Sequence, residues 1–150
     1  MTIGEFWLIY ITEARLSEGT KYIDSFHFGS DEKLANELLA LVLIGQKQAT
    51  TSCLKAYEIE GDELPKVGGY SIVTDWDGTP KCVIQTTQVT LLSLRDMTFD
   101  ICKREGEDEC LQTWREAHIP SFTQEGVELG YEFTEDQMVV FEDFKLVYQA

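Results

Sequence analysis

Basic residues are scarce in this sequence. Lysine and arginine together number 12, against 27 aspartates and glutamates, and the formal net charge is −15. Proteins that coat nucleic acid carry a basic surface, so the sequence excludes a protein of that kind. Any binding of RNA must be confined to one small positive site, because the rest of the negatively charged surface repels RNA. We expect the affinity of such binding to be weak and strongly dependent on salt.

Histidine is also scarce, and cysteine is not clustered. The two histidines, His27 and His118, are too few for a histidine-rich metal site. The four cysteines are Cys53, Cys82, Cys102 and Cys110. None of them forms a C-x-x-C pair, and their spacing matches no zinc ribbon or knuckle. We therefore expect reduced thiols that act as small buried hydrophobes, and no cofactor.

Long apolar runs are missing. The longest near the N-terminus, FWLIYI at residues 6–11, is too short to cross a bilayer. It has no cationic segment before it and no small-residue cleavage site after it, so it does not resemble a signal peptide. We expect a cytoplasmic protein without membrane contact, and either a monomer or a weak dimer.

Two helices are predicted before residue 46. Residues 6–16 place Phe6, Ile9 and Tyr10 on one face. The second helix is expected to be capped by Ser30. It carries a wide apolar stripe that indicates a largely buried helix, and it ends at Gly45, where a left-handed residue is typical.

The middle and the end of the chain favour strands. Strands are predicted at residues 51–57, 70–76, 81–94 and 138–148, and Asp77–Gly78 is a strong hairpin signal. Helices are predicted within residues 95–105 and 107–118. The irregular order of helices and strands argues against a doubly wound parallel sheet. The prediction is an α+β protein with a small, partly closed, mostly antiparallel barrel flanked by helices.

The segment GQKQAT, residues 45–50, places Lys47 and Thr50 directly behind the buried helix. In a fully extended chain these two side chains would face opposite ways, so they can share a site only if the chain bends between them. The alternative is that Gly45 is a plain helix terminator, the next residues are exposed, and Thr50 begins a strand.

This segment resembles the G-x-K-x-x-T motif of the ASCH domain family, although Gln48 stands where the family often has threonine. Further likenesses follow in the same order: ELLALVLIG, KVG, REGEDE, WREAH and VVFEDFKLVY. They resemble the larger bacterial members. The resemblance implies a PUA-like pseudo-barrel over residues 26–148, with residues 1–25 as a helical extension packed on it. It also implies a cleft beside the motif that binds RNA or a modified nucleoside.

The resemblance also implies an alternative function. Some family members hydrolyse the acetyl amide of N4-acetylcytidine with a lysine, a threonine and a glutamate, to which Lys47, Thr50 and either Glu105 or Glu107 correspond. Lys47 could act as the base if its ammonium lost a proton, or Glu105 could be the base while Lys47 stabilises the oxyanion. A ribonuclease is a less favoured alternative, and only in that case do we expect the acidic residues 105–109 to hold Mg²⁺.

Other residues are candidates for binding RNA or a base. Trp114 and His118 are four residues apart on a predicted helix, so they face one way and could stack on a base or pack in the core. Arg115 points elsewhere and could reach a phosphate. The remaining candidates near the motif or on a hairpin tip are Gly45, Ser52, Lys55 and Trp76.

Three functions therefore remain open: a binding module, an enzyme, and an interaction protein with a vestigial cleft. Convergence of Lys47, Thr50 and Glu105 on a small apolar-lined pocket would favour the enzyme. An open basic groove would favour the binding module. Separation of Lys47 from Thr50 by the barrel wall would favour the interaction protein.

Overall fold

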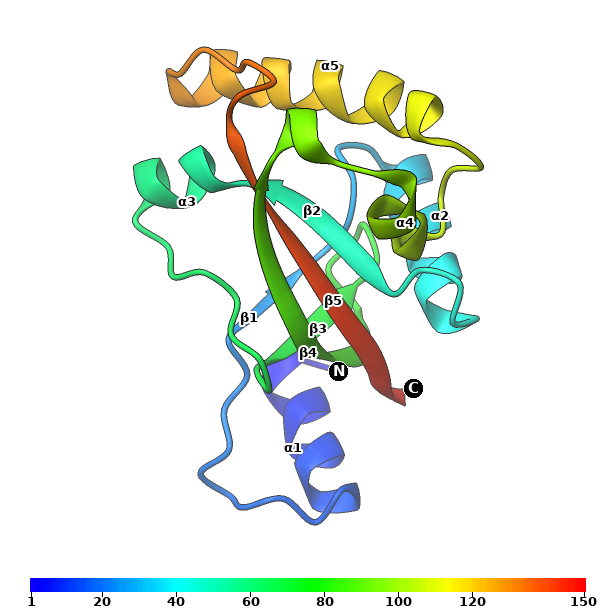
Figure 1. The fold of residues 1–150 in the computed structure, drawn as a ribbon. Helices are drawn as coiled ribbons and strands as arrows, with labels where there is room; N and C mark the ends of the chain where they lie inside the picture. The colour runs from blue at the N-terminus through cyan, green and yellow to red at the C-terminus, as the bar shows by residue number, and fades with distance from the viewer.

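A curled five-stranded sheet forms the centre of the molecule (Figure 1). The computed structural model describes residues 1–150. The strands are, in spatial order, β1 (Asp24–Phe26), β3 (Tyr70–Thr74), β4 (Pro80–Ser93), β5 (Met138–Gln149) and β2 (Ala49–Cys53). β1 pairs with β3 in parallel, and the other three pairings are antiparallel. This half-barrel confirms the predicted α+β class and its mostly antiparallel strands.

Five helices surround the sheet. They are α1 (Ile3–Glu13), α2 (Glu32–Leu43), α3 (Leu54–Glu60), α4 (Phe99–Cys102) and α5 (Leu111–Leu129). Two single 3₁₀ turns, η1 (Leu94–Asp96) and η2 (Lys103–Glu105), lie between β4 and α5. α1 and α5 lie at opposite ends of the long β4–β5 pair (Figure 1). None of these helices is both long and apolar enough to span a membrane.

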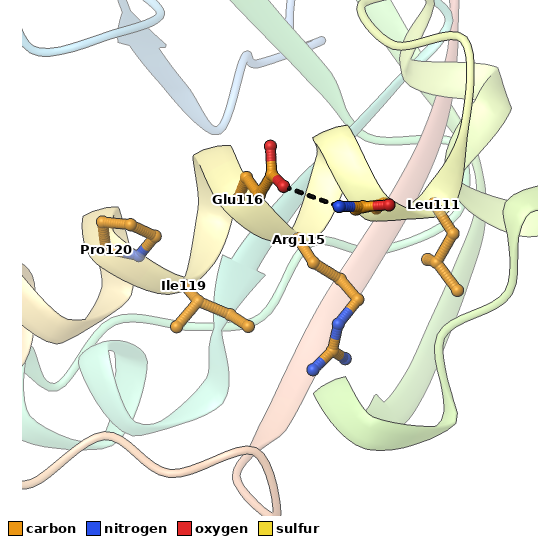
Figure 2. A pocket seen from close by; sticks show the side chains of 6 residues that line it. Leu111, Arg115, Glu116, Ile119 and Pro120 are labelled. Carbon is orange, nitrogen blue, oxygen red and sulfur yellow. Dashed lines mark hydrogen bonds between the residues drawn. The ribbon is translucent and has the colours of Figure 1, made fainter.

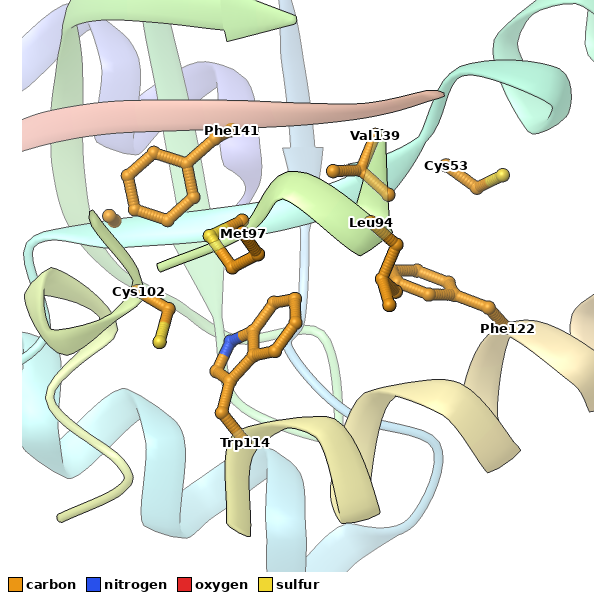
Figure 3. Close-up of a cluster of buried hydrophobic side chains, with 9 residues drawn as sticks. Cys53, Leu94, Met97, Cys102, Trp114, Phe122, Val139 and Phe141 are labelled. Carbon is orange, nitrogen blue, oxygen red and sulfur yellow. The ribbon is translucent and has the colours of Figure 1, made fainter. Parts of the chain in front are cut away.

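The core beneath α5 is the part of the fold that supports the candidate site. Trp114 and Phe122 of α5 pack against apolar side chains from the strands and from the segment between β4 and α5 (Figure 3). These partners are Ala49, Cys53, Leu94, Met97, Cys102, Val139 and Phe141. Close packing of this kind holds side chains in single positions, so residues anchored here have fixed geometry.

The chain turns sharply where α2 ends. Gly45 has a φ of +81°, a left-handed conformation that glycine adopts without steric cost. Its N–H donates to the Val42 carbonyl, and the N–H groups of Gln46 and Lys47 both donate to the Leu41 carbonyl at 2.9 and 3.0 Å. This turn directs the chain from α2 into β2, and it lies before Lys47 and not between Lys47 and Thr50.

Several predicted elements need correction. The strand predicted over residues 51–57 is wrong beyond Cys53, because helix α3 begins at Leu54. The N-cap of α2 is Asp31, whose carboxylate accepts from Leu34 N–H at 2.8 Å, and not Ser30. The helix predicted over residues 107–118 begins at Leu111 and continues through Pro120 to Leu129. The short strand β1 was not predicted.

Candidate functional site

Lys47 is a buried lysine whose ammonium group is fully occupied. Its side chain is 1% exposed. Its Nζ lies 2.8 Å from the Ala49 carbonyl oxygen, 3.4 Å from Glu105 Oε1 and 2.6 Å from Glu107 Oε2. The ammonium also lies over the Phe28 ring, 5.2 Å from its centroid. An ammonium has three N–H donors, so these three acceptors use all of them.

Glu105 is the second buried charge of the site, and one of its oxygens is saturated. Oε2 accepts a hydrogen bond from Thr51 Oγ1 at 3.0 Å and another from the indole N–H of Trp114, and it lies 3.4 Å from His118 Nε2. Burial acts to raise the pKa of Glu105. The bond from His118, the charge of Lys47 and the indole N–H outweigh burial and lower that pKa to about 2. Glu105 is therefore a fixed anion and a weak base.

The pKa values of Glu107 and His118 are both raised, whereas the pKa of Glu105 is lowered. Burial raises the pKa of Glu107, and the charge of Glu105 adds to this, although Lys47 opposes both. Burial acts to lower the pKa of His118, but the Glu105 carboxylate raises it overall. His118 also stacks on Trp114, with ring centroids 4.2 Å apart, and its Nδ1 lies 2.8 Å from the Trp114 carbonyl oxygen. Of the two carboxylates, Glu107 is thus the stronger base and the more exposed.

These groups line one cavity of about 380 Å³. Its wall is formed by the segment before α2, by α2 itself, by β2 and by the segment around η2, with one side of α5. The lining residues are Phe28, Gly29, Ser30, Leu34, Leu38, Lys47, Thr50, Thr51, Glu105, Glu107, Ala117, His118, Ser121 and Phe122. A volume of ~300–1,000 Å³ with apolar walls and a few polar groups is typical of small-molecule sites.

Both threonines of β2 reach the cavity, but they differ in their contacts. Thr50 lines it without a hydrogen bond to Lys47 or Glu105. Thr51, which was not among the predicted site residues, is the threonine that donates a hydrogen bond to Glu105. Its position after the motif gave no signal, because the partner is 54 residues away in the chain.

The loop that carries both carboxylates is held to the motif by hydrogen bonds that its main-chain carbonyls accept. Gln48 N–H donates to the Arg104 carbonyl at 2.9 Å, and Gln46 Nε2 donates to the Gly106 carbonyl at 2.7 Å. Gly106 is left-handed, and a Cβ there would lie 2.2 Å from the Gln46 carbonyl oxygen. Only glycine fits this close approach. The motif therefore positions Glu105 and Glu107 as well as Lys47.

Of the seven predicted binding residues only His118 lines the cavity; Trp114 lies behind it in the core, and the other five lie elsewhere. Gly45 forms the turn after α2, and Ser52 lines a separate, smaller hollow beside α3. Lys55 is paired with Glu58 on the surface. Trp76 packs against His27 with the two rings tilted and their centroids 4.8 Å apart.

Arg115 is the fifth of these residues. It forms an ion pair with Glu135 and lies in a separate pocket on α5 with Leu111, Ile119 and Pro120 (Figure 2). The structure therefore brings Lys47, Thr50, Glu105 and His118 together, with Trp114 behind them in the core.

No group of three or more histidine, cysteine, aspartate or glutamate side chains is arranged to hold a metal ion. In the acidic segment 105–109, Glu105 and Glu107 turn inward to Lys47, whereas Glu109 is exposed. The inward pair already has a cationic partner.

Comparisons with known proteins agree with this architecture. The family model of the ASCH domain matches residues 24–148. A crystal structure of an ASCH domain from Lactobacillus crispatus JV V101 is 35% identical, with a TM-score of 0.89 over 97% of this chain and 94% of that one. Protein EF3133 from Enterococcus faecalis V583 is 29% identical, with a TM-score of 0.88 over 99% and 94% of the two chains. No curated protein matches the sequence significantly.

The family match covers most of the chain and includes the G-x-K-x-x-T segment and the loop with both carboxylates. The chain belongs to the ASCH domain family.

Proposed function

We propose that the protein binds a nucleoside, free or as an accessible unit of RNA, with its base in the cavity beside Lys47. The ASCH family is generally thought to bind RNA, which gives the ligand class. The observation that carries the proposal is the cavity with polar groups at Lys47 and the two carboxylates and with aromatic rings at Phe28 and Phe122. Aromatic rings stack on bases of any sequence.

The charges of the cavity favour a neutral base over a phosphate. Lys47 is the cavity's one lysine or arginine, and all its N–H donors already bind oxygen atoms. A phosphate placed there would face Glu105 and Glu107, and like charges in a partly dry site repel strongly. The sugar and any phosphate therefore extend toward the mouth of the cavity.

Calorimetric titration with cytidine and with cytidine 5′-monophosphate tests this proposal. We expect saturable binding of cytidine and weaker binding of the monophosphate, with the difference shrinking as salt screens the net charge of −15. Lys47→Met should lower the affinity for cytidine, whereas Lys55→Met, a matched change on α3, should not. Absence of cytidine binding to the wild-type protein would contradict the proposal.

A second candidate function is hydrolysis of an acylated cytidine in the same cavity. It is favoured by the presence of Lys47, Thr50 and a carboxylate on one cavity wall. When Glu107 takes a proton as the base, it loses its charge, and the Lys47 N–H that it held can donate to the oxyanion instead. This matches the assignment in which a glutamate is the base. Glu107 suits that role better than Glu105, because the low pKa of Glu105 makes it a poor proton acceptor. Thr50 then supplies or orients the attacking oxygen.

Hydrolysis predicts a large effect of Lys47→Ala on N4-acetylcytidine turnover. Loss of the oxyanion partner should reduce kcat/KM by at least about 100-fold, as measured by release of cytidine. Lys55→Ala serves as the control and should retain full activity. An unchanged rate in Lys47→Ala, with circular dichroism showing an intact fold, would remove Lys47 from the reaction.

A further inference from the structure

β2 lies at one edge of the sheet, so only one of its long sides is paired. That side pairs with β5, with Thr50 opposite Glu142 and Ser52 opposite Val140. The other side has no neighbouring strand. On that side Lys47 Nζ, which lines the cavity, bonds the Ala49 carbonyl, so the unpaired side of β2 borders the candidate site.

The hydrogen-bond pattern identifies which main-chain groups face the unpaired side. Phe144 N–H donates to the Gln48 carbonyl at 2.9 Å. In an antiparallel ladder, alternate residues direct both N–H and C=O toward the partner strand. Counting from Gln48, the residues that face β5 are Thr50 and Ser52, so the main-chain groups of Thr51 point away from β5. The Ala49 carbonyl confirms this alternation, because it accepts from Lys47 Nζ on the outer side.

Thr51 therefore presents an N–H donor and a C=O acceptor side by side at the cavity. No main-chain group in a loop, turn or helix cap forms a hydrogen bond with the N–H or the C=O of Thr51. No side chain does so either, because the hydrogen bond between Thr51 and Glu105 uses the Thr51 hydroxyl. Main-chain N–H and C=O groups are strong hydrogen-bonding groups, so this adjacent donor and acceptor can take a complementary ligand edge.

Resting on the proposed function, we infer that the main-chain N–H and C=O of Thr51 bind the Watson–Crick edge of the base. Cytosine offers a ring-nitrogen acceptor, N3, beside an exocyclic amino donor at N4. N3 accepts from the Thr51 N–H, and the N4 amino group donates to the Thr51 carbonyl. A base bound in this way adds one rung to the free side of β2, with selectivity supplied by the backbone and not by a side chain.

Three ligands test this inference on the wild-type protein by calorimetric titration. Cytidine is compared with 3-deazacytidine, which has a C–H in place of N3, and with N4,N4-dimethylcytidine, which lacks the amino donor. Each analogue should bind roughly 10-fold more weakly than cytidine, the usual effect of one lost hydrogen bond. Equal affinity of all three would overturn the inference and leave the proposed function standing. If cytidine itself fails to bind, the proposed function is overturned and this inference with it.

Two variants assign the effect to the backbone. Thr51→Val removes the hydroxyl and keeps the N–H, so it should still bind cytidine more tightly than 3-deazacytidine. Thr51→Pro also removes the N–H, and an edge strand tolerates proline where its N–H points away from the ladder. Thr51→Pro should bind cytidine and 3-deazacytidine equally. If a folded Thr51→Pro protein still bound cytidine more tightly than 3-deazacytidine, the inference would be overturned. If this variant does not fold, the three ligands compared on the wild-type protein test the inference.

Discussion

Glu105→Ala lowers the free energy of unfolding by roughly 4 kcal/mol, the cost of breaking a buried ion pair from one side. Glu105 is 2% exposed and lies 3.4 Å from Lys47. Removing its carboxylate leaves the hydroxyl of Thr51 and the indole N–H of Trp114 without their acceptor. Urea denaturation followed by circular dichroism measures the change, and Glu105→Gln, which keeps the shape, should lose less.

Glu107→Ala is the matched control. Its carboxylate also contacts Lys47, but burial and the charge of Glu105 oppose its ionised form, so we expect a loss of no more than about 1 kcal/mol.

The two glutamate variants should also differ in their pH dependence. The pKa of Glu105 is lowered on folding, so its stabilisation is present above the unfolded pKa of ~4.3 and is lost as the pH falls toward about 2. The difference in the free energy of unfolding between the wild type and Glu105→Ala should therefore decrease as the pH falls through that range. If Glu105→Ala and Glu107→Ala lowered the free energy of unfolding equally at neutral pH, this account of the site would be contradicted.

Trp114→Ala lowers the free energy of unfolding by about 3–5 kcal/mol, as expected for truncating a large core side chain. Trp114 is fully buried in the cluster beneath α5. Its loss leaves a void between α5 and the sheet and removes a hydrogen bond to Glu105. Because His118 stacks on the indole, the cavity wall should also loosen, so cytidine affinity should fall with stability.

Trp76→Ala provides the comparison for Trp114. Trp76 is 37% exposed and contacts His27 at the surface, so we expect a loss of about 1 kcal/mol or less and unchanged cytidine affinity. Thermal and urea unfolding of the two variants measures the difference. A larger loss for Trp76→Ala than for Trp114→Ala would contradict the assignment of Trp114 to the core.

The sheet was predictable from sequence because its strands carry strong local signals. The alternating pattern of residues 138–148 and the β-branched run of residues 81–94 correspond to β5 and β4. The turn at Gly45 was predictable for the same reason, since the apolar stripe of α2 ends there. β1 was not, because a strand of three residues has too little pattern to detect.

The candidate site was predictable only in part. Lys47 and the glutamates were found through a resemblance, since nothing local shows that a lysine is buried. Thr51 was missed because its importance comes from Glu105, which only the folded chain brings near. The helix α3 was missed because β-branched residues precede it and its first residue has no side-chain cap.

The close contact between Gly106 and Gln46 has a consequence for sequence change in this chain. Two segments 60 residues apart touch there through their backbones, and there is no space to absorb an added residue. An insertion between Lys103 and Glu107 would shift one or both acids out of register with the lysine, whereas one between Asp108 and Cys110 would leave them in place. Length variation is therefore expected only on the C-terminal side of this contact.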